Sequence, residues 1–213
     1  MSMPMLAGVG LLVVCCSSAS AAAMMMGGDG DDSSDSAAGA GAGAGAKTPV
    51  VPTLPSGQYV RLEHTVAHDA NAPGNDDDKH KILNLAELEI FAEDPAAGPG
   101  AWRSLTDDVR GVTGTSLAAN YPGTNLIDGN MTNFAHTWGR DVNVKDEFTV
   151  DLGSVQEIGK IKITNRVDCC QKRAIGVKAV ILGADGTTVI KETPAITTEA
   201  ATYTFTFPGT AWA

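Results

Sequence analysis

From Tyr59 onward, the sequence consists of short segments in which apolar and polar residues alternate, with turn signals such as Asp128-Gly129 and Asp185-Gly186 between them. The segments are residues 59–63, 82–91, 148–152, 158–164, 175–182, 187–191 and 203–207. A period of two is typical of half-buried strands, and no long segment has the 3.6-residue period of a helix. Many short strands separated by turns predict an all-β domain with the architecture of a β-sandwich.

The chain begins with an apolar run at residues 6–16, followed by small residues as at a signal-peptide cleavage region. We expect residues 1–26 to be a cleaved signal peptide or, alternatively, a membrane anchor acylated at Cys15 or Cys16. In both cases the protein is secreted, or is anchored at the cell surface with an extracellular domain.

Residues 27–56 are of low complexity: an acidic, Ser-rich stretch is followed by an Ala-Gly alternation and a Pro-containing stretch. Such a composition cannot bury a core, so the segment predicts a disordered linker. The folded domain is therefore expected to span residues 57–213, preceded by a disordered N-terminal tail.

The charge of the chain excludes some classes of partner. It has 25 Asp and Glu against 15 Lys and Arg, a formal net charge of −10. An acidic surface repels phosphate backbones and anionic lipid headgroups, so we expect no nucleic-acid partner and no membrane contact beyond an N-terminal anchor. The sequence also has no Ser/His/Asp or Cys/His set, no phosphate loop and no carboxylate pair suited to glycoside hydrolysis, so we predict that it is not an enzyme.

Two adjacent cysteines, Cys169 and Cys170, lie between Arg166 and Arg173. Neighbouring Cα atoms are about 3.8 Å apart, whereas ordinary disulfides prefer about 5.5–6 Å, so a bond here closes a small, strained ring. Such a ring gains almost no loop-closure entropy, and this favours a role in binding. If oxidised, the pair indicates a secretory or extracellular setting. The alternatives are a reduced, inert pair and arginines that form only surface ion pairs with Asp168.

The run from Arg166 to Arg173, with Cys-Cys inside it, resembles the F-type lectins (fucolectins), a sugar-binding branch of the discoidin, or coagulation-factor type C, superfamily. The turn at residues 128–130, the His136-Thr137 pair and the strand at residues 148–153 agree with it in order. The resemblance covers residues 57–207 and implies a jelly-roll β-sandwich of the discoidin or galactose-binding-domain type.

In that family, one His and two Arg side chains hold a fucose, and a vicinal disulfide packs against an apolar edge of the sugar. The sugar-binding residues that the resemblance implies here are His136, Arg166, Asp168, Cys169, Cys170 and Arg173. A guanidinium group can satisfy two sugar oxygens at once, and an imidazole can donate on one nitrogen and accept on the other. Asp168 could orient an arginine or neutralise part of the charge.

The resemblance also implies a calcium ion. One loop offers several oxygen donors of the kind a hard cation prefers. Residues 85–90 resemble the family's C-terminal strand, which supplies the other ligands, with Ala86 in place of a cysteine; this suggests a circularly permuted strand order. The expected ligands are a carbonyl of Ala86, the carboxylate of Glu87, and Asn125, Asp128, Asn130 and Asn133.

These features predict a calcium-stabilised lectin for terminal fucose or a related sugar on glycans. Affinity at one site should be weak, so avidity would come from multivalent display, for example in a homo-oligomer. The alternatives are a discoidin-type adhesion module for a protein or lipid surface, and a non-catalytic carbohydrate-binding module that serves a separate enzyme. Trp138 could contact a second sugar or cap the core.

Overall fold

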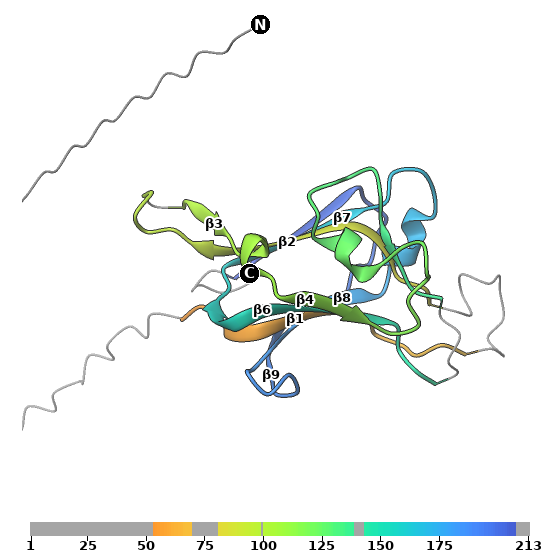
Figure 1. Cartoon of the computed structure of the whole chain (residues 1–213), viewed down its shortest axis with the longest axis horizontal. Coiled ribbons are helices and arrows are strands. Elements are labelled where there is room, and N and C mark those ends of the chain that lie inside the picture. Colours follow the sequence, from red (N-terminus) through yellow and green to blue (C-terminus); the bar gives the residue numbers. More distant parts are fainter. Residues whose placement is uncertain (1–52, 70–80, 99, 139–142, 208–213) are drawn as a thin grey trace, which may run out of the picture. The chain divides into compact units, whose positions relative to one another are not determined.

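The computed structural model describes residues 53–69, 81–98, 100–138 and 143–207 (Figure 1). The expected signal peptide or anchor at residues 1–26, most of the expected linker and residues 208–213 lie outside the described residues. In the described ranges, the secondary structure consists of ten strands and three short 3₁₀ helices, without an α-helix. None of the helices in these ranges is long and apolar enough to cross a membrane.

The strands form two antiparallel sheets, drawn as two layers in Figure 1. The first sheet has the order β4 (Gly111–Gly114), β6 (Glu147–Glu157), β1 (Ser56–His64), β8 (Val177–Leu182) and β9 (Val189–Glu192). The second has the order β10 (Thr202–Thr206), β7 (Lys160–Asn165), β2 (Asn84–Glu93) and β3 (Trp102–Ser104), and β5 (Ala135–His136) pairs with the start of β2. The all-β jelly-roll prediction is confirmed.

The core lies between the sheets and is built from the alternating apolar positions of both. Phe148 and Val150 of β6 are fully buried, as are Ile161 and Ile163 of β7. Residues between them point outward because successive side chains of a strand leave on opposite faces. All seven predicted strand segments contain a strand, with boundaries shifted by a few residues.

Strand β2 contains a bulge that matters for the site. Its pairing with β7 shifts register between Leu85 and Glu87, which leaves Ala86 as an additional residue. Before the bulge, Leu83 and Leu85 belong to the core; after it, the even-numbered Leu88 does. Asn84 and Glu87 therefore lie on the outer face of the sheet, and yet they are buried, at 1% and 2% exposure, because loops cover this face.

The loops contain three one-turn 3₁₀ helices: η1 (Thr106–Asp108), η2 (Gly123–Leu126) and η3 (Gln171–Ala174). Helix η2 packs close to β2, β4 and β5, and η3 packs close to β2. Most of the predicted calcium residues lie on η2 or in the loop after it, and the predicted sugar residues around the cysteines lie just before η3 or on it. The loops over the start of β2 are therefore part of the folded domain.

Candidate functional site

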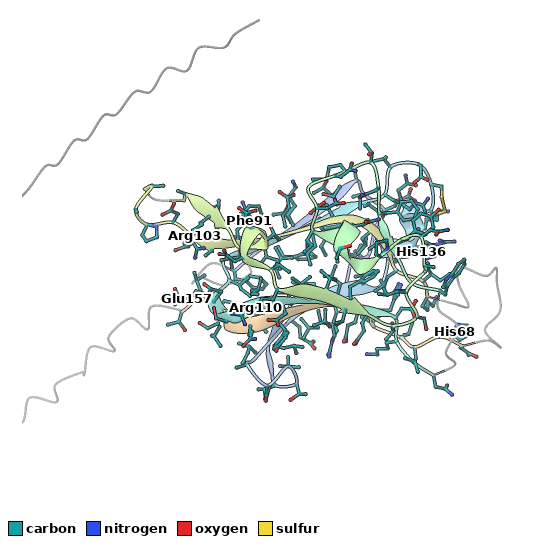
Figure 2. All side chains as sticks on the ribbon, viewed as in Figure 1. His68, Phe91, Arg103, Arg110, His136 and Glu157 are labelled. Atoms are coloured by element: carbon teal, nitrogen blue, oxygen red, sulfur yellow. A yellow bond between two sulfur atoms is a disulfide. The ribbon has the colours of Figure 1, made fainter. Side chains whose placement is uncertain are left out.

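Strand pairing brings the predicted sugar residues to one end of the second sheet. Asn84, at the start of β2, lies opposite His136 of β5, and Leu85 lies opposite Asn165, the last residue of β7. Arg166 follows directly after β7. Figure 2 labels His136 at this end of the sandwich. The antiparallel geometry thus places the imidazole and the first arginine around the beginning of β2.

The guanidinium group of Arg166 is fixed on several sides. Its Nε donates to Asp168 Oδ1 at 2.7 Å and its Nη2 donates to Asp168 Oδ2 at 2.5 Å. Its Cζ lies 3.7 Å from the ring centroid of Phe134. The hydrogen bonds from Arg166 lower the pKa of Asp168 to about 2, so this carboxylate stays charged at neutral pH. The Arg166 side chain is only 9% exposed, whereas that of Asp168 is 59% exposed.

Asn84 links the two arginines. With its amide oxygen turned toward them, Asn84 accepts from Arg166 Nη1 at 3.0 Å and from Arg173 Nη1 at 3.2 Å. The same Arg173 nitrogen lies 3.4 Å from His136 Nε2. One buried amide therefore positions both guanidinium groups, and Arg173 extends the cluster to the imidazole.

The two cysteines form a disulfide between adjacent residues, with a Cα–Cα distance of 3.8 Å. Cys170 has a φ of 65° and directly precedes η3, which carries Arg173. Asn165 Nδ2 donates to the carbonyl of Gln171 at 2.9 Å and so ties this turn to the end of β7. The disulfide sits on the turn that joins the two arginines, and Cys169 is exposed beside them.

The predicted calcium residues lie next to this cluster. Gly129 N donates to Glu87 Oε2 at 3.1 Å, which brings the loop after η2 onto β2. Asn133 Nδ2 donates to Asp128 Oδ2 at 2.7 Å, and Asn130 N donates to Asp128 Oδ1 at 2.9 Å. The structure thus brings Glu87, Asp128, Asn130 and Asn133 into one region, with Ala86 at the adjacent bulge.

Two observations test whether this loop fits a cation. The pKa of Glu87 is raised to about 7, mainly by burial and to a smaller extent by the charges of Asp128 and Glu89, against the hydrogen bond from Gly129 N, which lowers it. Asn133 Oδ1 is buried and accepts no hydrogen bond from any described residue. A bound positive ion would stabilise the charged carboxylate of Glu87 and would give Asn133 Oδ1 a partner. The donor set therefore fits a hard cation. The described residues hold no group of three or more His, Cys, Asp or Glu side chains arranged for a metal, so amide and carbonyl oxygens would have to contribute.

Asn125 and Asn130 are less clearly directed to this region. Asn125 Nδ2 donates to the carbonyl of Phe134 at 3.0 Å, which fixes the loop above β2. Asn130 Oδ1 accepts from Thr132 N at 3.0 Å and from Thr132 Oγ1 at 2.7 Å. Both side chains therefore have a structural role in the loop, and their role as calcium ligands stays a prediction.

The sequence arguments missed Asn84 and Phe134, which hold the arginines in place. Asn84 carries no distinct signal, because a polar residue between Leu83 and Leu85 is what any half-buried strand of alternating residues contains. Phe134 carries none either, since its position under Arg166 depends on the path of the loop. The ring of Phe134 stacks on that of Tyr121 with centroids 4.5 Å apart.

Residues 125–212 match the family model of the NedA-like, galactose-binding domain. The match contains His136, Arg166 and Arg173, but it covers less than half of the chain and begins after β2, so Asn84 and Glu87 lie outside it. It supports the galactose-binding-like (F5/F8 type C) superfamily, whose domains are generally non-catalytic, and fits carbohydrate binding in general. No curated protein and no solved structure matches the chain.

Proposed function

We propose that this chain is a calcium-stabilised lectin that recognises terminal fucose or a related sugar on glycans and has no catalytic activity of its own. The observation that carries the proposal is the single buried amide of Asn84, which holds the guanidinium groups of Arg166 and Arg173 beside His136. A cluster of donors prepared in this way suits a ligand rich in hydroxyl groups, because little ordering remains to be done on binding.

The chemistry of the cluster suits a neutral sugar better than an anion. Asp168 pairs with Arg166 through both carboxylate oxygens and cancels its charge, while guanidinium N–H groups of Arg173 can donate to sugar oxygens. The sulfur atoms of Cys169 and Cys170 offer an apolar contact for a C–H edge of the ring. The disulfide also supports a secreted or cell-surface location, because such bonds persist in oxidising compartments.

Calcium would be held by the oxygens of Glu87, Asp128, Asn133 and, at the bulge, Ala86, with Asn125 and Asn130 in the same loop. Its role would be to tie this loop to β2, below the sugar residues. We expect calcium to raise the thermal unfolding temperature of the full chain and Glu87→Gln to remove this increase. Glu89→Gln is the matched control, because Glu89 lies two residues away on the same face and pairs with Lys162 at 2.5 Å. Equal stabilisation of both variants would contradict the calcium assignment.

The sugar assignment is tested by applying the full chain to a glycan array with and without a chelator. We expect retention on fucosylated glycans, weaker retention after calcium removal, and none for Arg166→Ala or Arg173→Ala. Lys160→Ala, at the opposite end of the sandwich, is the control for fold and charge. Absence of retention by the wild type, or unchanged retention by both arginine variants, would refute the proposal.

A second candidate function is adhesion to a protein or lipid surface. Val167 is 65% exposed and Ile175 is 40% exposed, and both lie on the loop that carries the disulfide. Exposed apolar loop residues are typical of surfaces that insert into or dock on a partner. Binding to liposomes that free fucose does not inhibit, and that Val167→Ser reduces, would favour this function over the lectin.

A further inference from the structure

The backbone around His136 presents a second aromatic residue on the same side as the imidazole. His136 and Trp138 are two residues apart in an extended segment, so their side chains leave on one face. Thr137, between them, points the other way and is fully buried, with its Oγ1 accepting from Leu83 N at 3.0 Å. The rings of His136 and Trp138 have centroids 5.5 Å apart and planes inclined by 56°.

The position of Trp138 is set by backbone hydrogen bonds on both sides. Trp138 N donates to the carbonyl of Ser116 at 2.9 Å, and Thr137 N donates to the carbonyl of Leu83 at 2.9 Å. Leu117 and Thr137 form an antiparallel bridge. Trp138 is nevertheless 44% exposed. A large apolar ring is thus held in place with part of its surface exposed to solvent.

Aromatic rings connect this indole to the arginine cluster. Phe134 lies under Arg166 and stacks on Tyr121, whose ring centroid is 5.8 Å from that of His136. Tyr121 is 38% exposed. Trp138 continues this row beyond the imidazole, so a ligand longer than one sugar, bound at His136, would reach it.

We propose that Trp138 is the platform of a second sugar subsite, which binds the sugar residue joined to the terminal sugar held by His136, Arg166 and Arg173. This inference rests on the proposed lectin function. The C–H groups on one face of a pyranose ring carry partial positive charge, and the face of an indole is negative, so the two surfaces attract when stacked. The subsite favours ligands in which a second sugar ring is joined to the terminal one, so disaccharides bind more tightly than a single sugar.

A competing position for the second sugar also includes Arg166. A cleft of about 430 Å³ is lined by Arg166, Val167, Gln171, Glu199, Ala200 and Ala201. Its lining has no aromatic ring on which a sugar could stack. We therefore assign the second sugar to Trp138, and a variant in this cleft serves as the competing test.

The experiment measures, by titration calorimetry on the full chain, the dissociation constants of methyl fucoside and of fucose joined to galactose or to N-acetylglucosamine. For Trp138→Ala we expect the advantage of the better disaccharide over methyl fucoside to fall about five- to tenfold, with methyl fucoside itself changed less than about twofold. Trp138→Phe should keep most of the advantage. Val155→Ala, which also truncates an exposed apolar side chain, and Glu199→Ala, in the cleft, should leave it unchanged.

Several results would overturn the subsite. One is that Trp138→Ala loses the same affinity for methyl fucoside as for the disaccharide, and another is that Trp138→Ala keeps the full advantage of the disaccharide. A third is that Glu199→Ala, instead of Trp138→Ala, selectively loses affinity for the disaccharide. If the wild-type protein binds methyl fucoside and binds neither disaccharide more tightly than methyl fucoside, only the subsite is refuted. Wild-type protein that binds none of these sugars would overturn the proposed function together with it, so the two failures are distinguishable.

Discussion

The two ends of β2 lie in different environments. At its start, Asn84 and Glu87 are buried under loops and interact with other polar groups. Near its other end, Phe91 is half-buried and Lys160 Nζ lies 4.1 Å from its ring centroid, with the Trp102 ring 4.7 Å from the same nitrogen. Figure 2 labels His136 at the first end and Phe91, Arg103, Arg110 and Glu157 toward the second.

The two ends of β2 differ in whether their polar groups are exposed to water or buried. At the second end, the lysine remains partly in water and its cation–π contacts are worth about 0.5–1 kcal/mol each, as at other exposed sites. At the first end, an amide and a carboxylate are buried, which is unfavourable unless each is paired. A fold that only needed stability could place apolar residues there. Among the described residues of β2, the buried polar side chains lie at its start, as the proposed sugar site at this end requires.

The largest contrast should come from truncating the cation at each end. Arg166→Ala should lower the free energy of unfolding by roughly 3–4 kcal/mol, because Asn84 loses a buried partner and Phe134 loses its covering group. Lys160→Ala should lower it by about 1–2 kcal/mol, the sum of its two cation–π contacts. Urea denaturation of both variants at pH 7 checks this. Similar losses at the two ends would remove the distinction between them.

A second test uses pH. His64 ends β1 at the same end as the site, and burial lowers its pKa to about 4, helped by the positive charge of Lys81. Neutral His64 is thus favoured in the folded state, so its contribution to stability is complete above pH 6.5. As pH falls from 6.5 toward 4, the unfolded chain takes up the proton first, and about 3 kcal/mol should be lost.

Denaturation curves between pH 7 and 4 measure this loss, and His64→Gln should be flatter than the wild type within that window. A variant with the same slope as the wild type would show that the histidine is not the group responsible.

The third test asks what Asn84 contributes. Asn84→Ala should lower the free energy of unfolding by about 2 kcal/mol and weaken sugar binding, since two guanidinium groups lose a shared acceptor. Asn84→Asp keeps an acceptor at the same place and should restore the positions of the arginines. Measuring both sugar affinity and unfolding distinguishes a binding role of Asn84 from a structural one. If the role is purely structural, Asn84→Ala lowers stability but leaves the sugar affinity of the folded protein unchanged.

The smallest effect on stability is expected for the disulfide. The double variant Cys169→Ser with Cys170→Ser should change the free energy of unfolding by less than about 1 kcal/mol, because bonding adjacent residues closes almost no loop. Sugar affinity should fall about fivefold through the loss of an apolar contact. Calorimetry with methyl fucoside checks the second value. Unchanged affinity would make the cysteines bystanders and leave the arginines to carry the site.

The sequence predicted the long strands and the four-residue β9, but not β3, β4 or β5. Strands such as β6 and β8 alternate over enough residues to show a period of two, whereas β3, β4 and β5 have three, four and two residues. The arginine and histidine candidates came from a motif in one stretch of chain. Asn84 could not be assigned in this way, because its role depends on three segments that meet only after the sheet has formed.

The bulge at Ala86 changes which positions of β2 face the core. Upstream of it, the odd positions belong to the core; downstream, the even positions do. Without Ala86, β2 would alternate regularly: Leu85 and Leu88 would still point to the core, and Asn84 would still point outward. The additional residue therefore acts on the local direction of the strand, because a bulge bends and twists the strand that carries it. In the proposed sugar site, exchange of the loop residue Trp138 would change ligand contacts alone. Deletion of Ala86 would instead change the direction of β2 between Asn84 and Glu87, and with it the position of the arginines relative to the proposed calcium loop.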